Sequence, residues 1–208
     1  TANFFMSQGI KKGDTVMVVL KRRYQFWYTM VALHKIGAIA VPASHQLTAH
    51  DYDYRFNTAK IKAVVMVGDE HMQHECEEAL KISPTVEKLI QVGGVTRDGW
   101  IDFDSGIENH SSVLPRMDTQ IDELMLMYFT SGTAGYPKIA AHSHKYALGH
   151  LVTAKYWHNV DRNGLHFTIS DTGWGKSVWG KLYGQWLSEA AVFTYDFDKF
   201  KAEDILPL

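Results

Sequence analysis

Cysteine is nearly absent from this 208-residue chain, in which Cys76 is the single example. One thiol cannot form a disulfide within the chain. Cys76 falls on the apolar face of a predicted helix, where a buried and reduced thiol is expected instead of a catalytic nucleophile.

Four other signatures are also missing. Lys and Arg total 21 against 23 Asp and Glu, and this lack of a basic surplus argues against nucleic acid as a partner. No G-x-G-x-x-G fingerprint is found, so a dinucleotide oxidoreductase has little support. We find no signal peptide and no apolar run long enough to cross a bilayer. We therefore expect no membrane span and a cytoplasmic location.

Histidine is abundant, with eleven residues, but the pattern does not favour a metal site. The chain has no second cysteine, and no carboxylates are spaced as a ligand array around the histidines. We therefore expect no metal bound directly by side chains. His142 and His144 follow a glycine-rich loop, and they could face a nucleotide bound there.

Apolar runs alternate with helical patterns along the whole chain, whose hydrophobic content of 46% is typical of a globular protein. Strands are predicted at residues 15–20, 38–42, 63–67, 88–92, 124–129, 165–169 and 191–195. This order predicts an α/β fold with a doubly wound, mostly parallel sheet and helices on both faces. Ligands of such sheets bind at the carboxyl ends of the strands.

Helix boundaries can be predicted at several points. A largely apolar helix at 25–36 should end at Gly37, and Thr48 with Asp51 forms a capping-box pattern. Asp69 should cap the helix that carries Cys76. Further helices are predicted at 143–157 and 178–187, and a long surface excursion at 93–118. The excursion suggests lobes at 1–118 and 119–208.

The most informative stretch is residues 128–138, which read Tyr-Phe-Thr-Ser-Gly-Thr-Ala-Gly-Tyr-Pro-Lys. Gly132 and Gly135 allow positive φ, so backbone N–H groups can converge on an anion, and Lys138 adds a positive charge. Pro137 and the Ile-Ala-Ala that follows Lys138 favour a second strand over a helix. The stretch predicts a phosphate-binding hairpin; the alternative is a plain turn between two strands.

Residues 170–177, Ser-Asp-Thr-Gly-Trp-Gly-Lys-Ser, form a second motif after a predicted strand. They match the Walker A pattern except that Ser170 replaces its first glycine, so a P-loop nucleoside triphosphatase stays open as an alternative. Trp174, Trp179, Tyr183 and Trp186 recur at helical spacing, which favours core packing for most of them.

The string at 128–138 closely resembles the phosphate-loop signature of the adenylate-forming enzymes, the acyl-CoA synthetases and their relatives. Residues 170–174 resemble the medium-chain acyl-CoA synthetase branch, with a link to fatty acid metabolism. The likeness covers essentially all 208 residues and implies part of the N-terminal, ATP- and acyl-binding domain of a larger enzyme. It further implies ATP, Mg²⁺ bound through ATP, coenzyme A and a small carboxylic acid as reactants. No oligomeric state is indicated.

The resemblance also assigns roles to residues. The phosphate-binding set is Thr130, Ser131, Gly132, Thr133, Ala134, Gly135 and Lys138, and Trp174 could wall an acyl pocket. Many relatives have a second hydroxyl residue where this chain has Ala134. The loss of one hydrogen bond to a charged group would weaken phosphate binding by about 1.5–3 kcal/mol unless water substitutes.

No catalytic residue of the family is expected within this chain, because the adenine contacts, the Mg²⁺ carboxylate and the catalytic lysine lie further along in the family. The chain opens without an initiator methionine, inside a helix-like pattern, and stops as another helix begins. We expect a piece of a larger enzyme that is inactive alone. The alternative function, outside the enzymes, is a non-catalytic nucleotide- or partner-binding segment.

Overall fold

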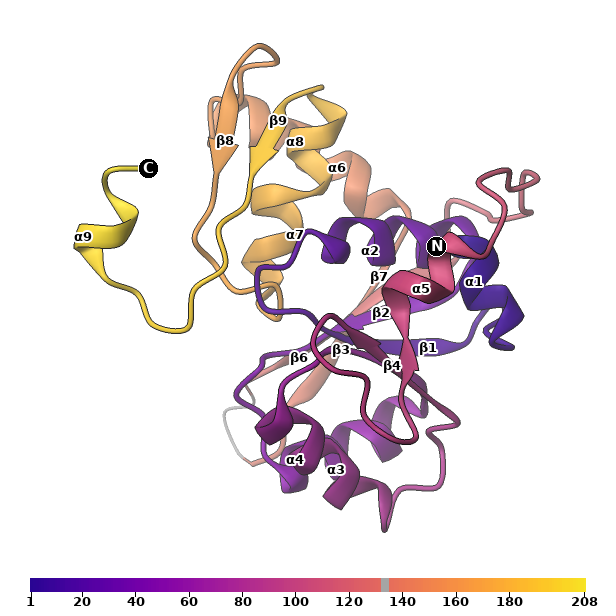
Figure 1. Cartoon of the computed structure of the whole chain (residues 1–208). Helices are drawn as coiled ribbons and strands as arrows, with labels where there is room; N and C mark the ends of the chain where they lie inside the picture. The colour runs from indigo at the N-terminus through magenta and orange to yellow at the C-terminus, as the bar shows by residue number, and fades with distance from the viewer. Residues whose placement is uncertain (132–134) are drawn as a thin grey trace.

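A seven-stranded sheet forms the centre of the computed structural model, which describes residues 1–131 and 135–208 (Figure 1). Its strand order is β5-β4-β3-β1-β2-β6-β7, and every neighbouring pair is parallel except β6 with β7. The strands are β1 Thr15–Val19, β2 Ile39–Pro42, β3 Ile61–Val67, β4 Lys88–Val92, β5 Ile101–Asp102, β6 Leu124–Thr130 and β7 Lys138–Ser143. The mostly parallel sheet is confirmed.

Helices cover both faces of this sheet, as Figure 1 shows, because the central strand β1 is apolar on both sides. Val16 and Val18 pack among α1 (Ala2–Ser7), α2 (Gln25–Lys35) and α5 (Phe103–Glu108), whereas Met17 and Val19 pack against α3 (Ala49–Ala59) and α4 (Glu70–Leu80). Phe56 of α3 is fully buried there, which contributes about 1.5–3 kcal/mol. The doubly wound architecture is therefore confirmed.

The predicted helix boundaries match the structure at three places. Gly37 follows α2 with φ of +73°, in the left-handed region that favours glycine. Thr48 and Asp51 form the capping box of α3, and Asp69 accepts a hydrogen bond from the Met72 N–H at the start of α4. Such caps contribute about 1 kcal/mol each, so these starts are fixed locally.

Residues 93–118 contain more regular structure than the prediction of a surface excursion allowed. They include β5 and α5, and Asp102 caps α5 by accepting from the Ser105 N–H. Phe103 is fully buried with its ring edge-on to Phe4 at 6.1 Å. A six-residue helix is too short to give a visible period in the sequence. Strands from both sides of residue 118 join the one sheet, and the division into lobes stays a prediction.

The C-terminal part differs from the prediction in three details. The predicted strands at 165–169 and 191–195 are β8 (Leu165–Phe167) and β9 (Ala191–Phe193), which form a separate parallel pair. Helix α6 (Lys145–Tyr156) begins after residue 143 because Ser143 pairs with β6. Leu182, with φ of −123°, divides the predicted helix at 178–187 into α7 (Gly175–Lys181) and α8 (Tyr183–Leu187).

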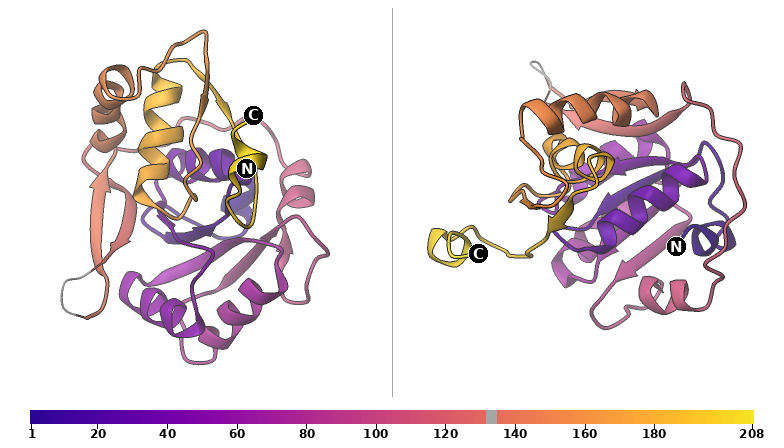
Figure 2. Two further views of the ribbon diagram at one scale, coloured as in Figure 1. Left: turned by 90° about the vertical axis from the view of Figure 1, so that its left-hand side faces the viewer. Right: turned by 90° about the horizontal axis from the view of Figure 1, so that it is seen from above.

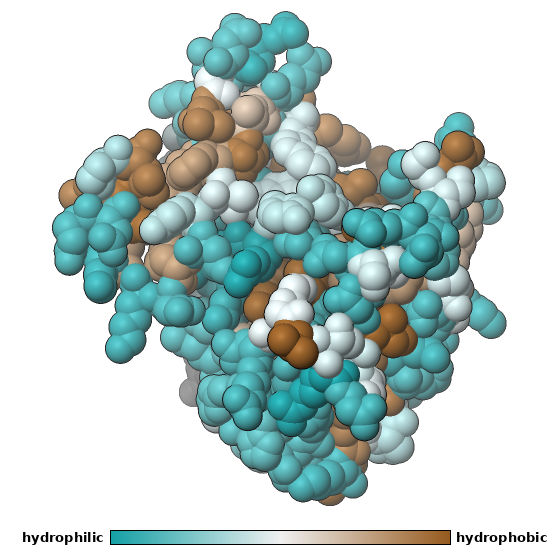
Figure 3. All heavy atoms as spheres, viewed as in Figure 1, coloured by the Kyte–Doolittle hydropathy of each residue, from teal (hydrophilic) through white to brown (hydrophobic). Residues whose placement is uncertain are grey.

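Hydrophobic residues reach the surface mainly in this C-terminal part. Figure 3 shows brown patches over the region of β8, β9 and α9 (Ala202–Ile205), whereas the surface over α3 and α4 is mostly hydrophilic. Figure 2 shows α9 at the end of an extended segment, away from the rest of the chain. In the two stretches that the structure describes, no helix is long and apolar enough to cross a membrane.

Candidate functional site

The predicted phosphate-binding loop joins two antiparallel strands. Thr130 at the end of β6 pairs with Lys138 at the start of β7, and the Thr130 hydroxyl donates to the Lys138 carbonyl at 3.3 Å. Ser131, Gly135 and Lys138 are exposed, and Gly135 has φ of +106°. The hairpin is thus confirmed. Gly132, Thr133 and Ala134 lie outside the described residues.

Helix α3 supports this hairpin from one side. The Tyr54 hydroxyl donates to the Pro137 carbonyl at 2.9 Å, and the Tyr54 ring stacks on Tyr136 with 4.7 Å between centroids. The guanidinium carbon of Arg55 lies 5.2 Å from the centre of the Phe129 ring. Sequence reasoning did not assign Tyr54 or Arg55, because no local signal marks a contact across more than 70 residues.

The second motif forms a turn against the carboxyl ends of β1 and β2. The Thr172 N–H and hydroxyl both donate to the Lys21 carbonyl just after β1. Gly173 lies so close to the segment after β2 that a Cβ on it would be 2.3 Å from the Ala43 carbonyl carbon. Since real Cβ atoms do not approach backbone so closely, only glycine fits here. The turn therefore places Trp174 beside the β2–α3 connection.

This turn is not built like a phosphate-binding P-loop, although α7 follows it. The Gly173 N–H donates to the Asp171 carboxylate at 2.9 Å, the Trp174 N–H to the Asp171 carbonyl at 3.2 Å and the Thr172 N–H to Lys21. A P-loop needs such N–H groups free to hold phosphate. Because these donors are already used within the protein, the P-loop alternative is not favoured.

A cleft of about 630 Å³ brings the two motifs together. It is bounded by the β2–α3 connection, by both flanks of the hairpin, by the 173–175 turn and by α6. The lining includes Ser44, Arg55, Thr130, Ser131, Pro137, His142, Tyr146 and Trp174. Trp174 is 63% exposed and forms part of the cleft wall, so it is not a core residue. Lys138 is exposed at the start of β7, beside the cleft and outside its lining.

The two histidines after the hairpin have different surroundings. His142 lines the cleft with its ring 4.1 Å from that of Tyr146, and partial burial lowers the pKa of His142. His144 instead lies 6.1 Å from the ring of His34 and does not line the cleft. Burial, with His144 nearby, lowers the pKa of His34 to about 3. Of the pair, only His142 is placed to face a ligand.

A second cavity of about 440 Å³ shares Trp174 with the cleft. His45 and Asp171 line it, and the His45 Nδ1 is 3.0 Å from an Asp171 carboxylate oxygen. Behind the turn, the buried Lys181 amine donates to the Ser170 carbonyl at 2.7 Å, and burial lowers the pKa of Lys181 to about 8. Sequence reasoning assigned no role to His45, because its partner Asp171 is 126 positions away. It assigned none to Lys181, because the sequence does not show that this lysine is buried.

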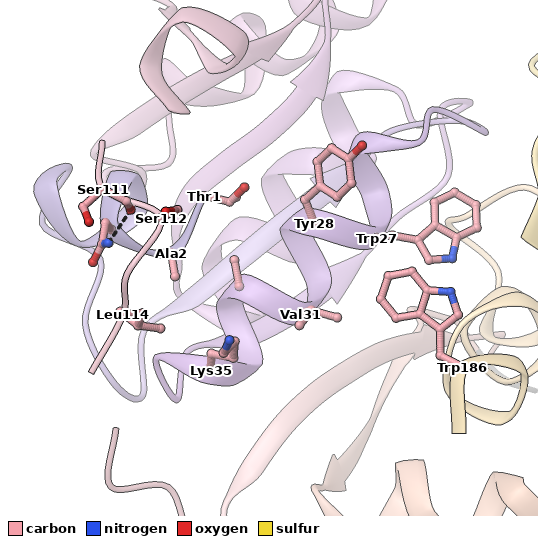
Figure 4. A pocket seen from close by; sticks show the side chains of 12 residues that line it. Thr1, Ala2, Trp27, Tyr28, Val31, Lys35, Ser111, Ser112, Leu114 and Trp186 are labelled. Atoms are coloured by element: carbon pink, nitrogen blue, oxygen red, sulfur yellow. Dashed lines mark hydrogen bonds between the residues drawn. The ribbon is translucent and has the colours of Figure 1, made fainter. Parts of the chain in front are cut away.

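A third cavity, of about 290 Å³, lies near Thr1 between α2, residues 111–114 and Trp186 (Figure 4). Trp27 and Trp186 lie at one end of it, and at the other the Asn3 amide donates to the Ser111 carbonyl at 2.7 Å. Lys35 is the one charged side chain among the described residues that line it. Neither predicted motif lines this cavity, so the 630 Å³ cleft remains the candidate site.

A parallel sheet with a glycine- and hydroxyl-rich hairpin beside the carboxyl ends of its strands defines an α/β protein with a candidate anion-binding site. A family model described as AMP-binding enzyme matches residues 1–205, and the chain belongs to that family. Acyl-coenzyme A synthetase ACSM3, mitochondrial, of Homo sapiens is 32% identical over 198 residues. Acyl-coenzyme A synthetase ACSM4, mitochondrial, of Homo sapiens is 31% identical over 199 residues.

These relatives are much longer than the chain. The match covers 95% of this chain but 33% of human ACSM3 and 34% of human ACSM4. Among solved structures, the anthranilate CoA ligase AuaEII in complex with anthranoyl-AMP has a TM-score of 0.89 at 20% identity, over 99% of this chain and 39% of that one. Brucella canis acyl-CoA synthetase has a TM-score of 0.84 at 22% identity, over 98% and 36%. Both likenesses show the same fold.

Proposed function

We propose that the protein containing this chain is an ATP-dependent acid–thiol ligase of the acyl-CoA synthetase type. A carboxylate attacks the α-phosphorus of ATP, pyrophosphate leaves, and a thiol, coenzyme A, then takes the acyl group from the acyl-adenylate. One observation carries the proposal: the glycine- and hydroxyl-rich hairpin and the 173–175 turn line the same cleft of about 630 Å³. The names of the relatives support the same reaction class.

In this proposal the hairpin holds the leaving pyrophosphate. Displacement at phosphorus requires that the charge of the β- and γ-phosphates be neutralised, because charge moves onto the leaving group. Hydroxyls and N–H groups of residues 130–135 are the proposed donors, and Lys138 supplies the positive charge. Lys138 pairs directly with Thr130 across the hairpin, so its charge stays at the base of the loop.

The acid is proposed to lie against Trp174. This indole forms part of the cleft wall, and a flat apolar surface there suits a medium-chain or aromatic acid. The two curated relatives are named acyl-coenzyme A synthetases, which agrees with an acyl substrate. A place in fatty acid metabolism is part of the proposal.

Magnesium is proposed to enter bound to ATP. The phosphates of ATP would supply its first ligands, because Mg²⁺ in phosphate-transfer sites is held by substrate phosphates together with one or two carboxylates. The cytoplasmic location stays a prediction. The names of both human relatives include the word mitochondrial, which does not favour it. Fractionation of cells that produce the full-length protein would test it.

The experiment is exchange of labelled pyrophosphate into ATP, catalysed by the full-length protein with a panel of acetate, octanoate and benzoate. We expect exchange with octanoate or benzoate, and a loss of about tenfold or more in Lys138→Ala, since a hydrogen bond to a charged group contributes about 1.5–3 kcal/mol. Lys155→Ala, which removes an exposed lysine on α6, is the control. No exchange with any acid would leave the non-catalytic binding segment as the better account.

Binding to the 208-residue chain alone tests the hairpin separately. It should bind pyrophosphate or ATP weakly and without selectivity for the base, and should not form an acyl-adenylate. Ala134→Thr restores a hydroxyl at a loop position and should raise this affinity modestly. Equal affinity of Lys138→Ala and the unchanged chain would contradict the role given to the lysine.

A further inference from the structure

Two cavities meet at the 170–174 turn, and the pair His45 and Asp171 lies at their boundary. Ser44 lines the 630 Å³ cleft and its neighbour His45 lines the 440 Å³ cavity, while Trp174 belongs to both linings. The two spaces are therefore separated by little more than this turn and the β2–α3 connection. A group bound in one cavity is adjacent to a group bound in the other.

Asp171 is built as a fixed acceptor for the imidazole. It is 6% exposed, one carboxylate oxygen accepts from the Gly173 N–H at 2.9 Å, and the other lies 3.0 Å from the His45 Nδ1. A carboxylate can only accept, so Nδ1 carries the proton and Nε2 is left with its lone pair. Among the described residues, none forms a hydrogen bond with this Nε2.

Charged side chains share the second cavity with His45, alongside the aromatic rings of Trp174, Phe197 and Phe200. Arg22, Lys176 and Asp198 also line the second cavity. Arg22 is held in place, with its Nε donating to the Ile169 carbonyl at 2.9 Å and its Nη1 to the Phe197 carbonyl at 3.0 Å. An imidazole oriented by a carboxylate and facing a cavity is the arrangement of a general base whose tautomer is fixed.

We propose that His45 is the base of the thiol-transfer step and that Asp171 is its positioning residue; this rests on the proposed function. The thiol enters through the second cavity and reaches the acyl-adenylate held beside Trp174. Its sulfur attacks the acyl carbonyl carbon while the S–H proton passes to the His45 Nε2. The C–S bond forms, the bond from the carbonyl carbon to the phosphate oxygen breaks, and AMP leaves with that electron pair. The imidazolium then gives its proton to water.

The test uses the full-length protein and separates the two half-reactions. Pyrophosphate–ATP exchange without coenzyme A reports acyl-adenylate formation, and single-turnover transfer from preformed acyl-adenylate to coenzyme A reports the second step. His45→Asn keeps an N–H near the position of Nδ1 but has no group that can take a proton. His71→Asn, an exposed histidine of α4, is the matched control.

For His45→Asn we expect exchange within about threefold of the unchanged protein and a loss of about 100-fold in thiol transfer at pH 7. The loss should shrink toward pH 9, because the thiol then ionises without help. Asp171→Asn should also slow transfer and shift the lower limb of its pH profile, which a merely structural role would not do. His71→Asn should match the unchanged protein in both steps.

Two results would overturn the inference alone: transfer by His45→Asn at the normal rate and pH profile, or equal losses in both half-reactions. The second result would mean that His45 only holds the turn in place. Absence of exchange in the unchanged protein is a different outcome, because it would overturn the proposed function and this inference together.

Discussion

Lys181 offers a direct test of how the 170–174 turn is held. Its side chain is 3% exposed, its amine donates to the Ser170 carbonyl, and burial lowers its pKa from 10.5 to about 8. Moving the pKa of one group by this much corresponds to about 3 kcal/mol. Asp171 partly opposes the shift and Arg22 adds to it.

The direction in which stability changes with pH follows from the number of protons that the folded and unfolded chains bind. Between pH 8 and pH 10.5 the unfolded chain still holds the Lys181 proton whereas the folded chain has released it, so the free energy of unfolding rises with pH. Below pH 8 both forms are protonated and the cost of the buried charge is fully present. Lys181→Met lacks this titration, so the unchanged chain should gain about 3 kcal/mol relative to it from pH 7.5 to pH 10.5.

The assay is urea unfolding followed by tryptophan fluorescence at several pH values, for the unchanged chain and Lys181→Met. Lys176→Met removes an exposed lysine from the same helix and should keep the rise, because Lys181 is still present. If the difference in free energy of unfolding between the unchanged chain and Lys181→Met stays constant with pH, then the amine is not buried and hydrogen-bonded to Ser170 as described.

Further predictions concern packing and reactivity. Gly173→Ala places a Cβ against the Ala43 backbone, so it should destabilise the protein by about 2–3 kcal/mol and abolish pyrophosphate exchange. Gly149→Ala on α6 meets open space and should stabilise the protein by about 0.5–1 kcal/mol. Thermal unfolding of both variants measures these changes. Burial raises the pKa of the Cys76 thiol to about 12, so a thiol reagent at pH 8 should label it only after unfolding. Fast labelling of the native chain would contradict its place in the core. Phe56→Ala should cost about 3–5 kcal/mol in chemical unfolding, and a cost below about 1 kcal/mol would contradict the α3 packing.

The features that could be predicted from sequence are those set by neighbours along the chain. The apolar run of β1, the capping box of Thr48 and the Asp69 cap depend on residues within four positions, and all three are present. Pro137 likewise predicts the second strand of the hairpin, because it disfavours a helix directly after the loop. The two-stranded hairpin was therefore predictable from the sequence, whereas its binding of phosphate stays a proposal.

Features that depend on distant partners could not be predicted in the same way. The contacts of Tyr54 with Pro137 and of His45 with Asp171 join residues 83 and 126 positions apart. The break at Leu182 arises where α7 and α8 pack as separate short helices, which helical periodicity cannot reveal. The sequence thus predicted the two motifs, while their meeting in one cleft required the tertiary structure.

The most direct test of the proposed function is the formation of acyl-adenylate by the full-length protein when ATP and an acid are supplied without coenzyme A. Mass spectrometry of the quenched reaction measures the product, with octanoate and benzoate as acids and the 208-residue chain in parallel. The account predicts about one equivalent of acyl-adenylate per full-length molecule and none from the 208-residue chain. Formation by the short chain alone, or none by the full-length protein with either acid, would contradict it.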